Sequence, residues 1–79
     1  MEIKILGPGC ARCKRLEELA RQAAKEAGVD ANITKVTDMA AITSYPILGT
    51  PGLVINEVVK SSGHIPRMED ILAWIKTAG

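Results

Sequence analysis

Two cysteines separated by two residues, Cys10 and Cys13, carry the clearest chemistry in this chain. They follow a short apolar segment and a Gly7-Pro8-Gly9 turn, and they open a segment with helical periodicity. At the start of a helix this spacing places both sulfurs on one side, close enough to bond to each other. The unpaired amides and the dipole of a helix N-terminus favour the thiolate, which is the reactive form of cysteine. The pair therefore predicts thiol–disulfide chemistry.

The two thiols are expected to differ in exposure. The apolar residues that begin at Leu16 recur every three or four positions, and extending their stripe backwards places Cys13 on the buried side of the helix. Cys10 falls one turn earlier, at the mouth of the site. We expect the pKa of Cys10 to lie below that of an ordinary cysteine and the pKa of Cys13 to lie above that of Cys10. Arg12 either tunes the pKa of Cys10, contacts substrate, or is a solvated helix residue.

Length and composition limit the possible functions. The 79 residues allow one domain, residues 1–79, and 47% hydrophobic content is enough to give it a core. A net charge of +1, with both signs interspersed, gives no reason to expect nucleic acid or a membrane surface as partner. The N-terminus is typical of a strand, so we expect no signal peptide and a cytoplasmic protein. In that compartment a CxxC pair is more often catalytic or metal-binding than structural.

The remaining pattern predicts alternating strands and helices that position the pair. In the first half of the chain we expect strands over 3–6 and 31–36 with a helix over 11–27 between them, followed by a short helix that Thr37 or Asp38 caps and Pro46 ends. In the second half we expect a strand over 53–55, a two-residue turn at Asn56-Glu57, and a strand that runs from 58 and ends at Gly63. The last expected element is a helix over 66–76 with Pro66 as its first residue. This is an α/β order, β-α-β-α-β-β-α, and it predicts a four-stranded mixed sheet with helices on both faces. The strand over 31–36 is expected at an edge.

Three motifs in this order resemble the thioredoxin fold. They are residues 7–13 (GPGCARC), residues 49–56 (GTPGLVIN) and residues 61–66 (SSGHIP). The match is closest to the small, glutaredoxin-like redox-active disulfide proteins of archaea and bacteria. A CxxC motif followed by Thr-Pro about forty residues later, a hairpin and a helix is much more specific than CxxC alone. The match covers nearly the whole chain.

The resemblance implies a protein disulfide oxidoreductase in which Cys10 attacks and Cys13 resolves. It implies that Pro51 is the cis-proline beside the disulfide and that the Thr50 backbone pairs with an extended substrate segment; Arg12 is a candidate substrate contact. The expected partners are protein disulfides and an electron-donor reductase, with no cofactor, no bound metal, and a monomeric state. Thioredoxins proper have Trp where this chain has Gly9, and Gly-Pro where it has Ala-Arg, so substrate and reduction potential do not follow from the resemblance.

Two other functions remain open from the residues. A soft-metal carrier for Cu(I) or Hg(II) also places CxxC between a first strand and a first helix. Such carriers usually have Met where this chain has Pro8, and they end in a strand, whereas residues 66–76 have helical spacing. A docking domain with idle cysteines is the third possibility. Asp38 is expected as a helix cap, Tyr45 as a cap on the core, and His64 as a turn or surface residue.

Overall fold

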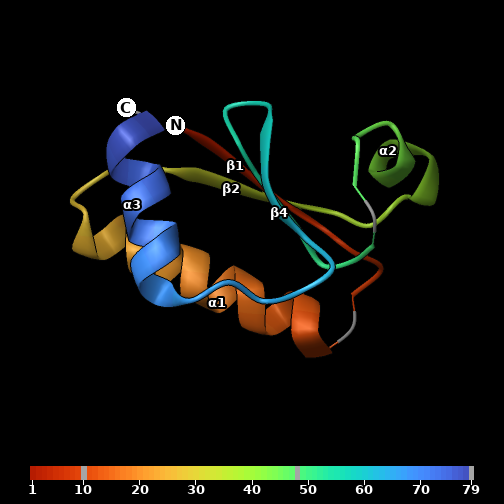
Figure 1. Ribbon diagram of the computed structural model, residues 1–79, viewed down its shortest axis with the longest axis horizontal. Coiled ribbons are helices and arrows are strands. Elements are labelled where there is room, and N and C mark those ends of the chain that lie inside the picture. The colour runs from red at the N-terminus through yellow and green to blue at the C-terminus, as the bar shows by residue number, and fades with distance from the viewer. Residues whose placement is uncertain (10, 48, 79) are drawn as a thin grey trace.

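The computed structural model describes residues 1–9, 11–47 and 49–78. Its elements, in chain order, are β1 (Glu2–Leu6), α1 (Ala11–Glu26), β2 (Asn32–Val36), α2 (Met39–Thr43), β3 (Gly52–Ile55), β4 (Val58–Ser62) and α3 (Met68–Ala78) (Figure 1). The predicted order of strands and helices is confirmed. None of the helices described is both long enough and apolar enough to cross a membrane.

The four strands form one mixed sheet in the order β2-β1-β3-β4. β1 and β2 are parallel and are joined through α1, whereas β3 is antiparallel to both β1 and β4. β2 lies at an edge, as predicted, and β1 and β3 occupy the centre. All four residues of β3 are buried, which agrees with its uninterrupted apolar sequence. The cysteine motif therefore follows a strand that is central in the sheet order.

Successive side chains of a strand point to opposite faces of the sheet, and apolar residues on both sides give a core on each face. The larger core joins α1 and α3 to the sheet; its fully buried members are Ile3, Ile5, Leu16, Ala20, Ala23, Ala24, Leu53, Ile55, Ile71 and Ile75. The smaller core, on the opposite face, consists of Leu6, Val54 and Ile42 of α2, with half-buried neighbours around them. Figure 1 shows α1 and α3 together on one side and α2 on the other. The prediction of helices on both faces is confirmed.

α1 ends at Glu26, one residue earlier than predicted, and the stop lies at Gly28, as the sequence predicts. This glycine has φ +68°, and its amide donates to the Lys25 carbonyl at 3.1 Å while the Val29 amide donates to Ala24 at 3.0 Å. The pattern is a Schellman motif, which favours glycine because a left-handed backbone strains other residues. On the exposed side of α1, Glu17 forms ion pairs with Arg21 of the same helix and with a lysine of β2. Arg21 is the main reason that the pKa of Glu17 is lowered.

The hairpin between β3 and β4 has the predicted two-residue turn. Asn56 and Glu57 have φ values of +49° and +67°, the left-handed conformation that a tight hairpin requires. Glu57 is an unusual residue for this position, and its carboxylate is bound by Lys4 and Tyr45 from neighbouring elements. These contacts explain how the turn tolerates a residue other than glycine.

The last helix begins two residues later than predicted. α3 starts at Met68, and the amides of Asp70 and Ile71 both donate to the Arg67 carbonyl. Arg67 thus precedes the first turn, while Pro66 is buried in the preceding segment instead of opening the helix. The last described element is still a helix, whereas the metal carriers considered above end in a strand, so this feature counts against the metal-carrier alternative.

Candidate active site

The predicted site lies at one end of the sheet, where β1 leads into α1. Cys10, expected as the attacking cysteine, lies outside the described residues. Cys13 is in the first turn of α1 and is 4% exposed, so the prediction of a sheltered second thiol is confirmed. The end of β1 and the loop before β3 lie beside it, and the loop after β4 is bonded to the neighbouring Arg12.

The sulfur of Cys13 packs directly against the backbone of Gly7. A Cβ atom built on Gly7 would lie 2.2 Å from Sγ of Cys13 and 3.3 Å from its Cβ. Two heavy atoms that are not bonded to each other do not approach so closely, so a side chain at position 7 would have to displace the thiol. The Gly7 amide also donates to the Val36 carbonyl of β2 at 3.0 Å, which fixes this segment to the sheet edge. Glycine at position 7 is therefore a requirement of the thiol's position.

The loop before β3 supplies the second wall of the site. The peptide bond between Thr50 and Pro51 is cis, as the resemblance implies. Pro51 is fully buried and Thr50 is half-buried. The Cβ atom of Thr50 lies 3.9 Å from the position that a Cβ atom would take on Gly7. The structure thus brings Thr50 and Cys13 to the same Cβ position of Gly7, although they are far apart in sequence.

Gly63 connects this loop to the start of α1. Its amide donates to the Pro51 carbonyl at 3.0 Å, and its own carbonyl accepts a hydrogen bond from Nη2 of Arg12 at 3.3 Å. Its φ is +81°, and its Cα atom lies 3.6 Å from the position of a Cβ atom on Gly49. The positive φ favours glycine at position 63, although a Cβ atom there would meet no atom within 4 Å.

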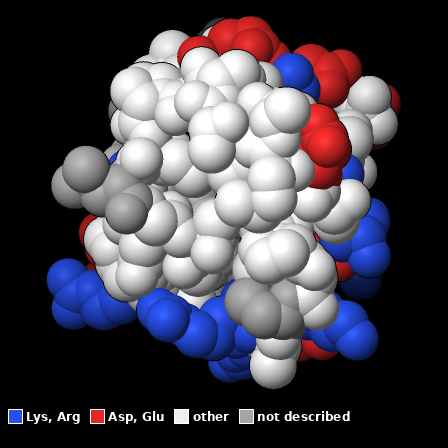
Figure 2. All heavy atoms as spheres, turned by 90° about the vertical axis from the view of Figure 1, so that its right-hand side faces the viewer, with Lys and Arg blue, Asp and Glu red and all other residues white. Residues whose placement is uncertain are grey.

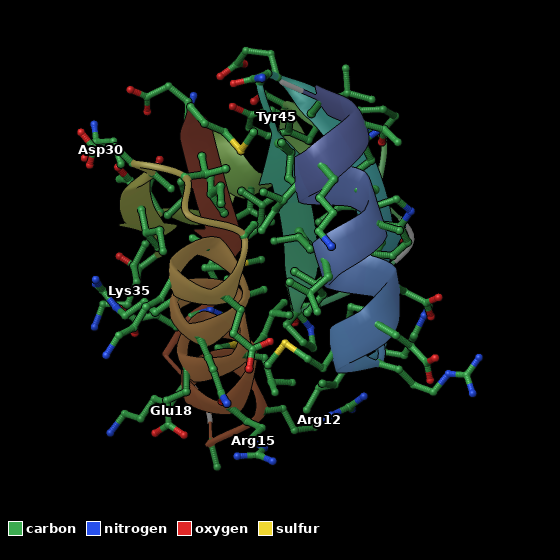
Figure 3. The ribbon with its side chains drawn as sticks, turned by 90° about the vertical axis from the view of Figure 1, so that its left-hand side faces the viewer. Arg12, Arg15, Glu18, Asp30, Lys35 and Tyr45 are labelled. Carbon is green, nitrogen blue, oxygen red and sulfur yellow. The ribbon has the colours of Figure 1, made fainter. Side chains whose placement is uncertain are left out.

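Arg12 is exposed, and Figure 3 shows its side chain extending from the start of α1 toward the start of α3. Its bond to Gly63 shows a role in the site that sequence reasoning did not consider, since it ties the cysteine helix to the loop that holds Pro51. Lys14 and Arg15 are exposed beside it, and Arg15 is 3.7 Å from Glu18. The first turn of α1 contains no acidic residue.

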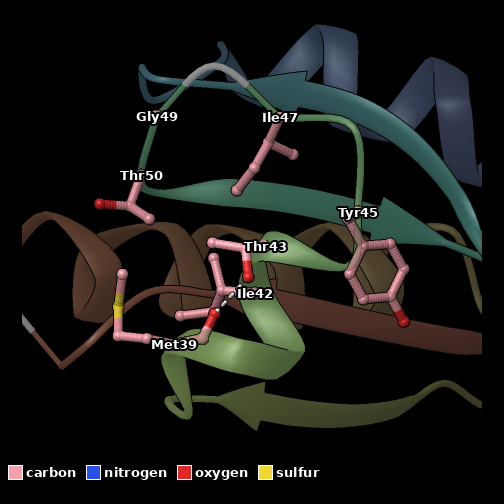
Figure 4. A pocket seen from close by; sticks show the side chains of 7 residues that line it. All are labelled: Met39, Ile42, Thr43, Tyr45, Ile47, Gly49 and Thr50. Carbon is pink, nitrogen blue, oxygen red and sulfur yellow. Dashed lines mark hydrogen bonds between the residues drawn. The ribbon is translucent and has the colours of Figure 1, made fainter.

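A hollow of about 230 Å³ adjoins the site on the side of α2 (Figure 4). Its lining residues all lie between positions 39 and 50: Met39, Ile42, Thr43, Tyr45, Ile47, Gly49 and Thr50. None of these residues is charged. The hydroxyl of Thr43 is turned to the helix backbone, where it donates to the Met39 carbonyl at 2.9 Å. Thr50 belongs to both the hollow and the Cys13 site.

A polar cluster fixes one wall of this hollow. Lys4 of β1 donates to the hydroxyl of Tyr45 at 2.9 Å and to Glu57, and the Tyr45 hydroxyl donates to Glu57 at 3.1 Å. The hydrogen bond from Lys4, followed by that from Tyr45, lowers the pKa of Glu57, and the hydrogen bond to Glu57 is the largest cause of the raised pKa of Lys4. The ring of Tyr45 packs against the smaller core, as predicted, but its hydroxyl has a role that the sequence did not indicate.

The remaining predicted residues have structural roles. Asp38 caps α2 by accepting a hydrogen bond from the Ala41 amide at 3.1 Å, which confirms the expectation for it. His64 is exposed in the turn after β4, with Nδ1 3.1 Å from the Ser62 carbonyl. Within residues 1–9, 11–47 and 49–78, no group of three or more His, Cys, Asp or Glu side chains could hold a metal ion.

Sequence reasoning did not predict the contacts through which two glycines shape the site, Gly7 against Cys13 and Gly63 with Pro51 and Arg12. A glycine directly after a strand and close in sequence to a reactive residue is a signal for close backbone approach, and Gly7 has this signal. Gly63 also follows a strand, but it is far in sequence from both cysteines. The hollow gave no comparable signal, because its seven lining residues follow no single helical or strand period.

Charges are unevenly distributed on the end of the molecule that carries α2. Figure 2 shows a largely uncharged face with Lys and Arg gathered mainly along its lower edge and Asp and Glu mainly along its upper edge. The lower edge is the side on which α1 begins in Figure 1. The small net charge of the chain therefore conceals a local excess of positive charge beside the site.

A mixed sheet of this order, with a thiol in the first turn of the first helix and a cis-proline before the third strand, defines a thioredoxin-like protein. A family model described as a thioredoxin domain matches residues 1–76. A thioredoxin of Methanothermobacter thermautotrophicus is 39% identical over 71 residues, which cover 90% of this chain and 92% of the relative. A thioredoxin of Methanocaldococcus jannaschii is 37% identical over 75 residues, covering 95% and 86%. The chain belongs to the thioredoxin domain family.

Proposed function

We propose that the protein is a dithiol–disulfide oxidoreductase in which Cys10 attacks a substrate disulfide and Cys13 resolves the mixed disulfide. The observation that carries the proposal is the position of Cys13, buried against Gly7 and beside the cis Thr50-Pro51 bond, in a member of the thioredoxin family. Membership in this family supports thiol–disulfide chemistry, and the burial of Cys13 supports its role as the second sulfur to react.

The reaction exchanges one disulfide for another. The Cys10 thiolate attacks one sulfur of the substrate disulfide; a sulfur–sulfur bond to Cys10 forms, and the other substrate sulfur leaves as a thiolate and takes up a proton. Cys13 then loses its proton and attacks the sulfur of Cys10, which releases the second substrate thiol. The substrate gains two electrons and two protons, and Cys10 and Cys13 are left as a disulfide. An electron-donor reductase returns this pair to two thiols.

Thr50, Pro51 and Arg12 form the substrate contact in this proposal. Thr50 is half-buried at the rim of the Cys13 site, which supports a role for its backbone in pairing with an extended substrate segment. Pro51 has no amide hydrogen and fills the wall behind it. Arg12 is exposed and donates one hydrogen bond to Gly63, which leaves further guanidinium donors for a substrate carbonyl or carboxylate.

The partners in this proposal are protein disulfides and the reductase, and the protein acts as a monomer in the cytoplasm. A cysteine pair that cycles between dithiol and disulfide suits a reducing compartment, where structural disulfides are rare. No nucleic acid, membrane, cofactor or bound metal has a part in the mechanism.

Trapping with single-cysteine variants tests the proposal. The variant Cys13→Ser should accumulate a mixed disulfide between Cys10 and substrate, because the second attack is removed. The matched variant Cys10→Ser should form none and should lose turnover. The variants would contradict the proposal if both formed mixed disulfides equally well, or if the native protein reduced neither a protein disulfide nor a small disulfide reagent.

A further inference from the structure

The hollow beside Thr50 has the size of a site for one side chain. Its volume of about 230 Å³ is below the roughly 300–1,000 Å³ of typical small-molecule pockets. Met39, Ile42 and Ile47 give it an apolar wall, and Figure 4 shows the ring of Tyr45 closing one end. A side chain that enters it would be removed from water without meeting a charge, so the hollow favours an apolar group.

Hydrogen bonds from residues that do not line the hollow fix the ring of Tyr45 at its end. The hydroxyl of Tyr45 is bonded to Lys4 and to Glu57, which come from β1 and from the hairpin turn. A ring held by two such contacts loses little further freedom when a ligand packs against it, which lowers the entropic cost of binding.

The hollow adjoins the thiol site through Thr50. Thr50 lines the hollow and also lies beside Gly7, against which Cys13 packs. An extended chain whose disulfide reaches this site would therefore pass the hollow within a few residues, because each extended residue spans about 3.3 Å.

The start of α1 adds a positive rim. Arg12, Lys14 and Arg15 are exposed within four positions of one another, and Lys14 forms no ion pair with any described residue. Three cations at a helix N-terminus oppose the helix dipole, so they do not stabilise the helix itself. Figure 2 shows positive charge gathered along this edge, with the negative charge of the same face mainly along the opposite edge. The rim is therefore complementary to carboxylates on a partner.

We propose that the protein selects disulfides in extended protein segments that carry an apolar residue on the side of α2 and acidic residues on the side of α1. The apolar side chain occupies the hollow, and the carboxylates meet Arg12, Lys14 and Arg15. The inference rests on the proposed function and deepens it by defining the class of substrate.

A set of synthetic disulfide peptides tests the inference with the full-length protein. Two parent peptides carry Leu on one side of a disulfide-bonded cysteine and two Glu residues on the other side; they differ in which of the two comes first in the sequence. One comparison peptide replaces Leu by Ser and another replaces both Glu residues by Lys. We expect kcat/KM for the better parent to exceed that of each comparison peptide by at least about tenfold, the range in which a hydrophobic pocket discriminates. The preference for Glu over Lys should shrink as salt is added.

Variants assign each preference to its surface. Met39→Asp should abolish the preference for Leu, whereas Val58→Asp, at an exposed apolar residue of β4, should keep it. Lys14→Glu should reverse the preference for Glu, whereas Lys25→Glu, which makes the same change of charge at the other end of α1, should keep it. Peptides with both cysteines replaced by serine should still shift the methyl resonances of Ile42 and Ile47, and not those of Ile71 and Ile75.

Two results would overturn the inference. Equal kcat/KM for all the peptides would exclude this selectivity and leave the proposed oxidoreductase standing. Equal or better turnover of glutathione disulfide relative to the parent peptide would identify a small thiol in place of a protein segment. Absence of exchange with every disulfide, including a small uncharged reagent, would instead refute the proposed function itself.

Discussion

The sulfur of Cys13 occupies the space that a side chain on Gly7 would fill, since a Cβ atom there would lie 2.2 Å from Sγ. The last turn before the cysteines and the buried thiol are therefore coupled directly, without an intervening residue. Because the thiol is also in the first turn of α1, its position is set from both the strand and the helix.

Gly7→Ala should displace Cys13 and slow the release of substrate. The added methyl group requires the thiol or the strand end to shift, and overpacking of this kind costs about 1–3 kcal/mol of unfolding free energy. We expect the mixed disulfide between Cys10 and substrate to persist longer than in the native protein, measured by acid quenching and mass spectrometry during turnover.

Gly28→Ala is the matched control for Gly7→Ala. Gly28 has φ +68° and no atoms within 4 Å of a Cβ position, so the substitution strains only the end of α1. It should cost about 1 kcal/mol and leave the lifetime of the mixed disulfide unchanged. An equal lifetime in both variants would show that Gly7 does not position the thiol.

The two cysteines should react with alkylating reagents at different rates. Cys13 is 4% exposed, so a reagent reaches its sulfur only when the site opens. Under native conditions, Cys10 in the variant Cys13→Ser should be alkylated faster than Cys13 in the variant Cys10→Ser, by a factor on the order of ten or more. Rates measured across pH give the two pKa values, and denaturation should make the rates similar. Equal native rates would contradict the assignment of roles.

The contribution of Glu57 to stability should depend on pH. Hydrogen bonds from Lys4 and Tyr45 lower the pKa of Glu57 in the folded protein below its ordinary value of 4.5. The unfolded chain therefore takes up the proton first, and the stabilisation is present above that ordinary value and is lost as pH falls through the lowered folded pKa.

Denaturant unfolding of the native protein and Glu57→Gln tests this dependence. The difference in unfolding free energy should be largest near about pH 7 and should shrink toward about pH 3. Glu26→Gln, at an exposed residue that pairs with no described side chain, is the control. A difference that stays constant over the whole range would show that the charge of Glu57 does not stabilise the fold.

Leu16→Ala should test the core that supports the cysteine helix. Leu16 is fully buried in the larger core, between α1 and the sheet. Its truncation should cost about 2–5 kcal/mol, from lost burial and from the cavity left behind. Leu19→Ala, at a half-buried position of the same helix, should cost less in the same denaturant titration. A smaller loss at Leu16 than at Leu19 would be inconsistent with this packing.

Much of this architecture follows from local sequence patterns. The helical stripe that contains Leu16 predicts the burial of Cys13, and the glycine at position 28 predicts the end of α1. The sequence predicts the start of α3 two residues too early, because Pro66 suits the first turn of a helix as well as the loop before a helix. Only the burial of Pro66 in that loop distinguishes the two positions. Lys4 and Glu57 are 53 positions apart, so no local pattern could predict their contact with Tyr45. The hollow that depends on this contact was unpredictable for the same reason.

The hydrogen bonds of Gly63 limit changes in the length of the loop between β4 and α3. Both of its backbone polar groups are engaged, the amide with Pro51 and the carbonyl with Arg12. An insertion or deletion between β4 and α3 would shift one of these bonds out of register. Homologues and engineered versions should therefore keep the loop length here constant.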